Sequence, residues 1–143
     1  MANILYAEDD RDCRELFAFA LRHNNHRVHE AINGAQAVQI VREEAIDLIV
    51  LDARMPMVTG YDAAKLIAKE ISDIPIVFLS ARGMRREVNL AFDSSPMVVD
   101  YLLKPIPPQQ LVDTVDHILE SCRTKGIASV REENMARELV LEW

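Results

Sequence analysis

The chain has 143 residues, of which 50% are apolar and 27% are charged, and its formal net charge at pH 7 is −7. This size and apolar fraction predict one domain with a hydrophobic core and a modest tail. The acidic balance argues against direct binding of nucleic acid, and apolar runs of only a few residues, with no signal pattern at the N-terminus, predict a cytoplasmic protein without a membrane span.

Five short runs with strand-like composition alternate with stretches of helical periodicity from one end of the chain to the other. The strands predicted from these runs are residues 4–7, 27–31, 48–51, 76–79 and 98–102. The third and fourth runs are apolar on both faces, which is typical of central strands covered by helices. The second run alternates and fits a strand at the edge of a sheet. The sequence therefore predicts an α/β fold in which a parallel sheet has helices on both faces.

Two predicted helices carry an apolar stripe at intervals of three and four residues. The stripe of the first helix consists of Cys13, Leu16, Phe17, Ala20 and Leu21. The stripe of the helix after the fifth strand consists of Leu111, Val115, Ile118, Leu119 and Cys122. Each stripe predicts a helix that buries one face, and the two cysteines are expected to be reduced core thiols.

The C-terminal part differs from the domain predicted over residues 1–122. Residues 123–126 predict a polar break, and Ser129 with Glu132 has the spacing of a capping box. We therefore predict an extension over residues 123–143 with an amphipathic helix at 129–142. Its apolar stripe would consist of Ala136, Leu139, Val140 and Trp143. Such a helix is marginal alone in water, so we expect it to dock on its own domain or on a partner or second copy.

Reactive side chains stand where four of the predicted strands end. Glu8 and Asp9 follow the first strand, Asp52 follows the third, Ser80 the fourth and Lys104 the fifth. Because the carboxyl ends of parallel strands meet at one edge of a sheet, we expect these side chains to lie close together.

The residue types at this edge suit magnesium-assisted transfer of a phosphoryl group onto an aspartate. Glu8, Asp9 and Asp52 offer the oxygen ligands that Mg²⁺ prefers, without forming a closed cage. Beside a cation, the ionised carboxylate of Asp52 is able to attack a phosphorus centre and form an acyl phosphate. Lys104 would stabilise the phosphoryl oxygens, and Ser80 would donate a hydrogen bond to them.

Two further residues belong to this interpretation. Pro105 follows Lys104, and such a step often takes the cis form in tight turns, which would aim the ammonium inward. Tyr101 stands three residues before Lys104, where an aromatic ring could move between exposed and buried rotamers. Ser80 and Tyr101 would then form a switch that reports the phosphoryl group.

Four segments together make residues 3–122 resemble the receiver domain of two-component response regulators. They are ILYAEDD, LDARMPMVTG, LSA and DYLLKP, in this order. The resemblance implies a flavodoxin-like (βα)5 fold with strand order 2-1-3-4-5. It also implies phosphorylation of Asp52 by a histidine kinase, with Mg²⁺ held by Glu8, Asp9, Asp52 and the backbone carbonyl of Arg54. The implied chemistry is self-directed, so we do not expect an enzyme.

The chain also departs from the family pattern. After the fourth helix, receivers usually have an Ala-Gly-Ala-like turn, whereas this chain has FDSSPMVVDY and is about two residues longer. Arg54 and Arg82 stand two residues after Asp52 and Ser80, and Ala81 lies in the same expected phosphate environment. One hypothesis is that the two guanidinium groups bind the phosphoryl group and alter its lifetime. The alternative is that both are solvated surface arginines.

The leading interpretation is a stand-alone receiver without room for an output domain, acting by contact with an unidentified target protein. A phosphorelay shuttle to a histidine phosphotransfer protein is the first alternative, and a receiver fragment of a larger regulator is the second. The candidate homodimer surfaces are the C-terminal helix and the face formed by the fourth helix, fifth strand and fifth helix. A Mg²⁺-dependent aspartyl-phosphate phosphatase would need a second Asp where the chain has Arg54. A nucleotide- or flavin-binding module would need a Gly-rich loop where the chain has EDDRD.

Overall fold

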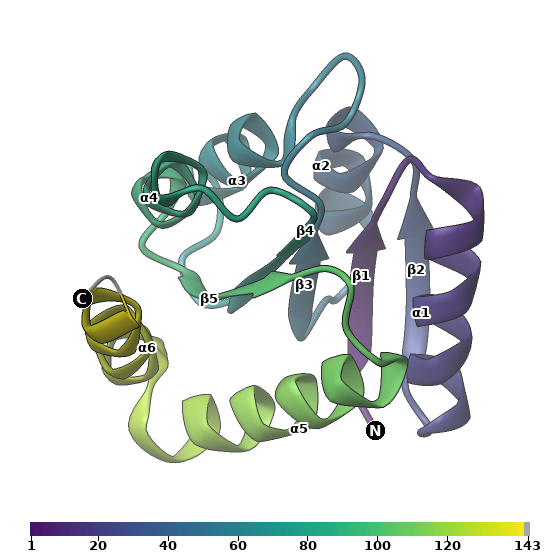
Figure 1. The fold of residues 1–143 in the computed structure, drawn as a ribbon. Coiled ribbons are helices and arrows are strands. Elements are labelled where there is room, and N and C mark those ends of the chain that lie inside the picture. The colour runs from purple at the N-terminus through teal and green to yellow at the C-terminus, as the bar shows by residue number, and fades with distance from the viewer. Residues whose placement is uncertain (142–143) are drawn as a thin grey trace.

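The computed structural model describes residues 1–141, with side chains through residue 137. Five parallel strands form one sheet in the order β2-β1-β3-β4-β5 (Figure 1). The strands are β1 (Asn3–Ala7), β2 (Arg27–Ala31), β3 (Leu48–Leu51), β4 (Ile76–Ser80) and β5 (Val98–Leu103). The predicted fold class and strand order are confirmed, and each strand boundary lies within one residue of its prediction.

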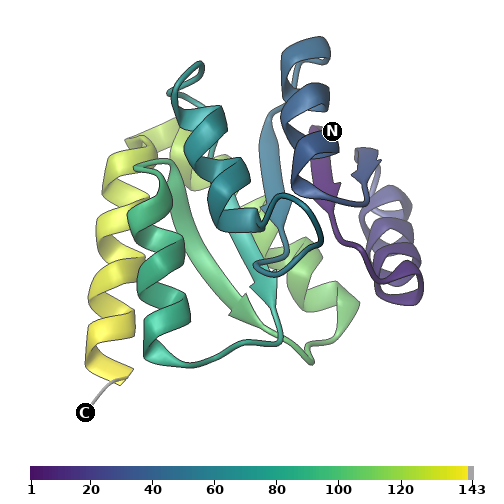
Figure 2. The ribbon, with the colours of Figure 1, turned by 90° about the horizontal axis from the view of Figure 1, so that it is seen from above.

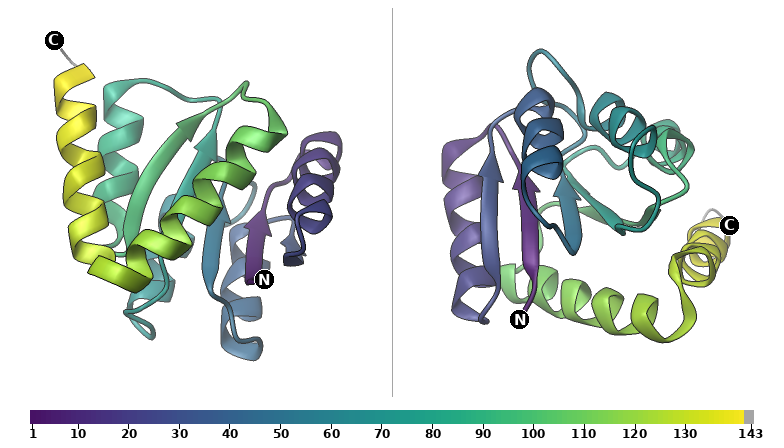
Figure 3. Two further views of the ribbon diagram at one scale, coloured as in Figure 1. Left: turned by 90° about the horizontal axis from the view of Figure 1, so that it is seen from below. Right: turned by 180° about the vertical axis from the view of Figure 1, so that it is seen from behind.

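Helices cover both faces of this sheet (Figures 2 and 3). They are α1 (Arg11–His23), α2 (Gly34–Glu43), α3 (Gly60–Ala68), α4 (Arg85–Ser94), α5 (Pro108–Lys125) and α6 (Ile127–Leu141). Alternate strand residues point to opposite faces. One set packs with α1 and α5, and the other packs with α2, α3 and α4. No helix within residues 1–141 combines the length and the apolar character that a membrane span requires.

The first turns of three helices are fixed by side chains that the sequence places just before them. Asp10, Asn33 and Thr59 each accept a hydrogen bond from a backbone N–H three residues ahead. These caps satisfy donors that have no partner within the helix, so α1, α2 and α3 begin at defined residues. Each of these caps follows a strand-to-helix loop at the carboxyl edge of the sheet. The caps therefore help to position the loops that carry the predicted site.

The apolar stripe predicted for α1 is partly wrong. Phe17 and Leu21 are buried as predicted, but Leu16 is 53% exposed. The side that contacts the sheet also includes Ala18, which is fully buried. The buried stripe is thus rotated away from Leu16, because α1 packs against both β2 and α5 rather than against the sheet alone.

The predicted polar break and the predicted start of the C-terminal helix are also wrong. The helix α5 continues through Lys125, so residues 123–125 are helical rather than a polar break. It ends at Gly126, whose φ of 85° suits glycine. The next helix starts directly afterwards at Ile127, which places Ser129 inside α6 rather than at its cap.

Of the two predicted alternatives for the C-terminal helix, the structure shows docking on its own domain, and the described contacts come from residues outside the predicted stripe. Figures 1 and 2 show α6 beside α4 and along β5. Its apolar contacts come from Val130, which is 3% exposed, and from half-buried Met135. Ala136 is exposed, and the side chains of Leu139, Val140 and Trp143 lie outside the described part of the chain.

Candidate functional site

The three predicted acidic residues meet at the carboxyl edge of the sheet. Glu8 follows β1 and Asp52 follows β3, and the backbone N–H of Asp52 donates to the carbonyl of Ala7 at 3.0 Å. One carboxylate oxygen from each of Glu8, Asp9 and Asp52 lies within 4.8 Å of the others. Glu8 and Asp52 are buried, whereas Asp9 is exposed. The cluster therefore opens to solvent on the side of Asp9.

Lys104 reaches this cluster from the end of β5. Its Nζ donates to Oε1 of Glu8 at 2.6 Å and lies 3.5 Å from Sγ of Cys13. The Lys104–Pro105 peptide bond is cis, as predicted. The backbone N–H of Lys104 donates to the carbonyl of Ser80 at 2.8 Å, which joins the ends of β4 and β5. The ammonium thus points into the acidic cluster.

The surroundings of the cluster shift the pKa values of its two buried carboxylates in opposite directions. Burial raises the pKa of Asp52, and the negative charge of Glu8 raises it further, to about 7. Burial also acts to raise the pKa of Glu8, but hydrogen bonds from Lys104 and Asp52 outweigh it, and the net shift is downward. Burial and the neighbouring Glu8 raise the pKa of Asp9. Asp52 is therefore the carboxylate that a nearby cation would affect most.

The path of the loop after Asp52 explains why the segment LDARMPMVTG ends in glycine. Gly60 lies so close to the backbone of Asp52 that a Cβ there would be 2.1 Å from the Asp52 carbonyl oxygen. Its N–H donates to the carbonyl of Ala53 at 3.0 Å, which closes the loop. Met57 has a φ of 70° at the outer turn of this loop. Coordination of a cation by the Arg54 carbonyl stays a prediction.

The two predicted switch residues lie on the opposite side of Asp52 from β1. Ser80 is 1% exposed, and its Oγ accepts a hydrogen bond from the backbone N–H of Arg82 at 3.2 Å. Tyr101 is in a buried rotamer, and its ring stacks on Phe78 with centroids 6.0 Å apart. The Tyr101 hydroxyl donates to the carbonyl of Arg82. Both residues therefore contact the segment that leads from β4 into α4.

The two arginines near the site occupy different environments. Nη2 of Arg54 donates to Oε1 of Glu87 on α4 at 2.8 Å, and its guanidinium lies 5.6 Å from the centroid of the Tyr61 ring. Arg82 and Ala81 are exposed, and the charge of Arg82 contributes to lowering the pKa of Glu87. Arg54 is thus held by helix α4 in this structure.

Glu87 and Tyr61 belong to the site but were not found from the sequence. Glu87 is 4% exposed, and the Tyr61 hydroxyl donates to its Oε2. Hydrogen bonds from Arg54 and Tyr61 hold the pKa of Glu87 below its usual value. These contacts join residues 33 and 26 positions apart in the chain, so no local spacing signals them.

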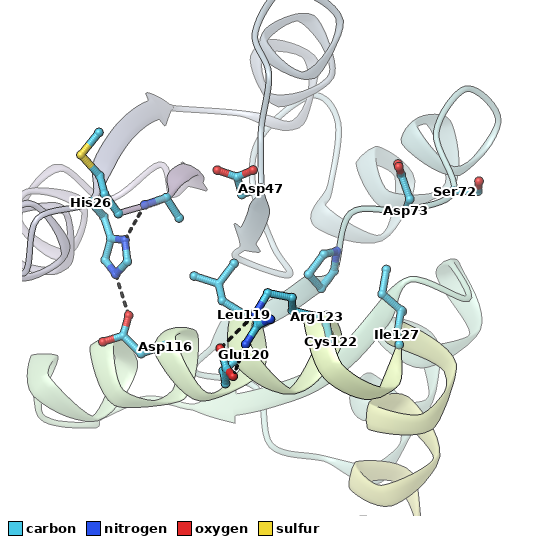
Figure 4. A pocket seen from close by; sticks show the side chains of 14 residues that line it. His26, Asp47, Ser72, Asp73, Asp116, Leu119, Glu120, Cys122, Arg123 and Ile127 are labelled. Atoms are coloured by element: carbon cyan, nitrogen blue, oxygen red, sulfur yellow. Dashed lines mark hydrogen bonds and ion pairs between the residues drawn. The ribbon is translucent and has the colours of Figure 1, made fainter.

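A separate pocket of about 810 Å³ lies at the amino-terminal edge of the sheet, between the N-terminus and α5. Figure 4 shows His26 with Nε2 on the carboxylate of Asp116, at 2.7 Å, while its Nδ1 accepts from the backbone N–H of Ala2 at 3.2 Å. Arg123 pairs with Glu120 beside them. None of the predicted site residues is among the described residues that line this pocket.

Comparisons with known proteins agree with the fold. The family model for the response regulator receiver domain matches residues 4–116. The chain is 32% identical over 126 residues to the probable transcriptional regulator ycf27 of Cyanidium caldarium, covering 87% of this chain and 49% of that protein. The chain spans about half the length of the curated relatives that it matches.

Receiver domains of known structure share the fold of this chain. The receiver domain of the Francisella response regulator 1452 has a TM-score of 0.78 and 26% identity, covering 87% of this chain and 100% of that chain. The BeF3-activated receiver domain of DrrB from Thermotoga maritima has a TM-score of 0.75 and 25% identity, covering 84% and 98%. Because the family model matches most of the length of this chain, the chain belongs to the response regulator receiver domain family.

Proposed function

We propose that this chain is a phosphoacceptor whose Asp52 takes a phosphoryl group from a histidine kinase or a histidine phosphotransfer protein. The observation that carries the proposal is the meeting of Glu8, Asp9 and Asp52 within 4.8 Å, with the Lys104 ammonium on Glu8. Membership of the receiver family supports it. Similarity to a receiver domain described as BeF3-activated supports a site that can be activated.

The acidic cluster fits Mg²⁺, because its donor atoms are carboxylate oxygens and it opens to solvent at Asp9. Glu8, Asp9, Asp52 and the backbone carbonyl of Arg54 would hold the ion. When bound, Mg²⁺ supplies positive charge that lets an anionic phosphoryl group approach another anion. The raised pKa of Asp52 fits a carboxylate that depends on a nearby cation to stay ionised.

In the proposed step, a carboxylate oxygen of Asp52 attacks the phosphorus of a phosphohistidine. The O–P bond forms while the P–N bond breaks, and the imidazole leaves with the electron pair of that bond. Lys104 and Ser80 donate hydrogen bonds to the phosphoryl oxygens, where negative charge gathers. Hydrolysis of the acyl phosphate restores the carboxylate. The chain therefore acts chemically on itself and has no proposed activity on other substrates.

The switch operates through the segment between β4 and α4. In this structure the Ser80 hydroxyl accepts from the backbone N–H of Arg82, and the Tyr101 hydroxyl donates to the carbonyl of the same residue. A phosphoryl group on Asp52 that draws the Ser80 side chain toward it moves Oγ away from the Arg82 N–H and breaks the first of these bonds. The backbone at Arg82 then shifts, and Tyr101 and the surface around it shift with it.

The signal leaves by protein contact, either to a downstream target or as a phosphoryl group passed to a histidine phosphotransfer protein. We propose a cytoplasmic location and neither nucleic acid nor membrane as a direct partner. A receiver that forms part of a larger regulator is the alternative, since the curated relatives are about twice as long. A homodimer through α4, β5 and α5 would have to displace α6, whereas one through α6 itself would not.

Intact-mass measurement after incubation with acetyl phosphate, with and without Mg²⁺, tests the proposal. Wild type should gain one phosphoryl group only when Mg²⁺ is present, and Asp52→Asn should gain none. Asp113→Asn is a matched control, because Asp113 is an exposed carboxylate on α5 away from the cluster. Turnover of unrelated phosphate esters would favour a phosphatase instead. Such an enzyme needs an acid where Arg54 pairs with Glu87.

Arg54 and Arg82 are further proposed to alter the lifetime of the phosphoryl group. Both stand two residues from a residue that contacts it, and a guanidinium binds phosphoryl oxygens in a paired geometry. The dephosphorylation half-lives of Arg54→Ala and Arg82→Ala, compared with wild type, test this role. Unchanged half-lives in both variants would remove it.

A further inference from the structure

We propose that the Arg54–Glu87 ion pair is a latch that holds α4 against the phosphoacceptor loop, and that phosphorylation of Asp52 opens it and loosens α6 from β5. This inference rests on the proposed function, because it needs a phosphoryl group on Asp52. Glu87 is here a positioning residue: it touches neither Asp52 nor the cation site directly, and it acts through Arg54.

The latch lies at the start of α4. Arg54, two residues after Asp52, donates to Glu87 at 2.8 Å, and Tyr61 of α3 donates to the other carboxylate oxygen. The Glu87 side chain is only 5% exposed, while that of Arg54 is 46% exposed. Among the described residues, the N-cap Met84 provides no side-chain cap for α4. The contacts of Glu87 with Arg54 and Tyr61 therefore tie this turn to the phosphoacceptor loop and to α3.

The other end of α4 is held by α6. Nη2 of Arg131 donates to the carbonyl of Phe92 at 2.9 Å, and its Nη1 donates to the carbonyl of Ser95 at 2.8 Å. The guanidinium also lies 5.5 Å from the centroid of the Phe92 ring. The last carbonyls of a helix lack partners within it, so Arg131 acts as a cap for α4.

The same helix covers the outer edge of the sheet. Arg131 also donates to the carbonyl of Val98 at 2.9 Å, and Asn134 donates to the carbonyl of Val99 at 2.7 Å. Arg137 contacts the buried carboxylate of Asp100 at 3.0 Å. Because β5 is an edge strand, these side chains satisfy backbone groups that would otherwise be open to another strand. Helix α4 is thus fixed to the site at one end and to this cover at the other.

Phosphorylation of Asp52 offers the Arg54 guanidinium a second anionic partner besides Glu87. A phosphoryl group adds about −1.5 to −2 charge close to the loop that carries Arg54. The half-exposed guanidinium is free to turn toward it, whereas the buried Glu87 carboxylate cannot follow. Without the hydrogen bond from Arg54, this carboxylate keeps that from Tyr61 and must reach water for the rest of its solvation, which lifts the first turn of α4. The movement strains the carbonyl contacts of Arg131 at the far end of α4, and α6 loosens.

Hydrogen–deuterium exchange on the full chain tests the latch. Phosphorylation with acetyl phosphate and Mg²⁺, with occupancy measured by intact mass, should raise exchange in α4 and α6 about threefold or more, but not in β1. Glu87→Gln, which keeps the shape but not the charge, should show this raised exchange without phosphate, and phosphorylation should add little. Arg54→Lys, which keeps the charge, should retain part of the rise in exchange that phosphorylation causes in wild type.

Arg42→Gln is the matched control, because it breaks another Arg–carboxylate pair, with Glu70 at 3.0 Å, away from the site. It should leave α4 and α6 unchanged. Unaltered exchange in α6 of phosphorylated wild type would overturn the latch and leave the proposed function intact. Glu87→Gln with wild-type exchange, or with a rise spread equally over β1, would also overturn it. If intact mass showed no phosphoryl group on Asp52, the proposed function itself would be contradicted.

Discussion

Lys104 donates to Glu8 at 2.6 Å, and this contact decides which of the two buried carboxylates keeps its charge. The hydrogen bond favours the ionised form of Glu8, while that negative charge disfavours ionisation of Asp52. The proposed nucleophile is therefore the more basic member of the pair. Without a cation, it is expected to be partly protonated near neutral pH.

The first prediction concerns Asp52→Asn in metal-free buffer. The raised pKa of Asp52, about 7 against 3.8, means that the folded chain holds more protons than the unfolded chain between these values. The free energy of unfolding of wild type should therefore fall as the pH rises from about 4 to about 7. Asn carries no charge, so the variant should be more stable than wild type at pH 8, by about 1–3 kcal/mol.

Urea unfolding at pH 5 and pH 8 in the presence of EDTA measures this effect. The advantage of Asp52→Asn should shrink at the lower pH, where wild type is also uncharged at this position. Asp113→Asn serves as the control, because that carboxylate is exposed on α5. An advantage of the same size at both pH values would show that charge at Asp52 is not its cause.

The second prediction concerns addition and removal of Mg²⁺. The ion should stabilise wild type, by about 2.7 kcal/mol when its concentration is 100 times its Kd, and EDTA should reverse the gain. Asp9→Asn removes one exposed ligand and should weaken binding about tenfold, which is about 1.4 kcal/mol. Binding should strengthen between pH 6 and pH 8 as Asp52 loses its proton. Thermal unfolding over a Mg²⁺ titration measures all three, and equal stabilisation of Asp52→Asn would contradict the site.

The third prediction concerns Lys104→Met. This change leaves the Glu8 carboxylate, which is 1% exposed, without its ammonium partner, so unfolding should become easier by about 2 kcal/mol. Phosphorylation of Asp52 by acetyl phosphate should also slow strongly, because no ammonium remains to stabilise the phosphoryl oxygens. Lys104→Arg keeps the charge and should recover part of both properties. Rates of mass gain and urea unfolding provide the two readouts.

Much of the fold could be predicted because its signals are local. The runs LIVL and IVFL are apolar at every position, so they predict central strands without knowledge of their neighbours. The positions of Glu8, Asp52 and Lys104 then follow, since each stands at the end of a strand and parallel strands end at one edge. Leu16 shows the limit of this reasoning, because the exact face that α1 buries depends on α5.

The features that were not predicted depend on contacts between distant parts of the chain. The pairing of Arg54 with Glu87 requires the path of the phosphoacceptor loop and the placement of α4, neither of which leaves a spacing signal. The contacts of Arg131 and Asn134 with β5 use backbone carbonyls, which every residue has, so the sequence carries no trace of them. The start of α6 was missed because the turn at Gly126 replaces the cap predicted at Ser129.

The fourth prediction compares two glycines. A Cβ at Gly60 would lie 2.1 Å from the carbonyl oxygen of Asp52, so Gly60→Ala must push apart the loop that positions the phosphoacceptor. We expect a loss of about 2 kcal/mol or more in unfolding free energy and a slower phosphorylation of Asp52. Gly126→Ala meets open space but has a φ of 85°, so it should cost about 1 kcal/mol and leave phosphorylation unchanged. Equal phosphorylation rates in the two variants would contradict the role of Gly60.

The fifth prediction concerns Arg131→Ala. Its guanidinium donates to carbonyls of Phe92, Ser95 and Val98, so the change removes the partners of three backbone acceptors at once. We expect a loss of about 2 kcal/mol in unfolding free energy, together with faster hydrogen exchange in α6. Arg123→Ala is the control, because both partners of its pair with Glu120 are exposed and the pair should contribute little to stability. Equal stability of the two variants would mean that the covering of β5 by α6 does not depend on Arg131.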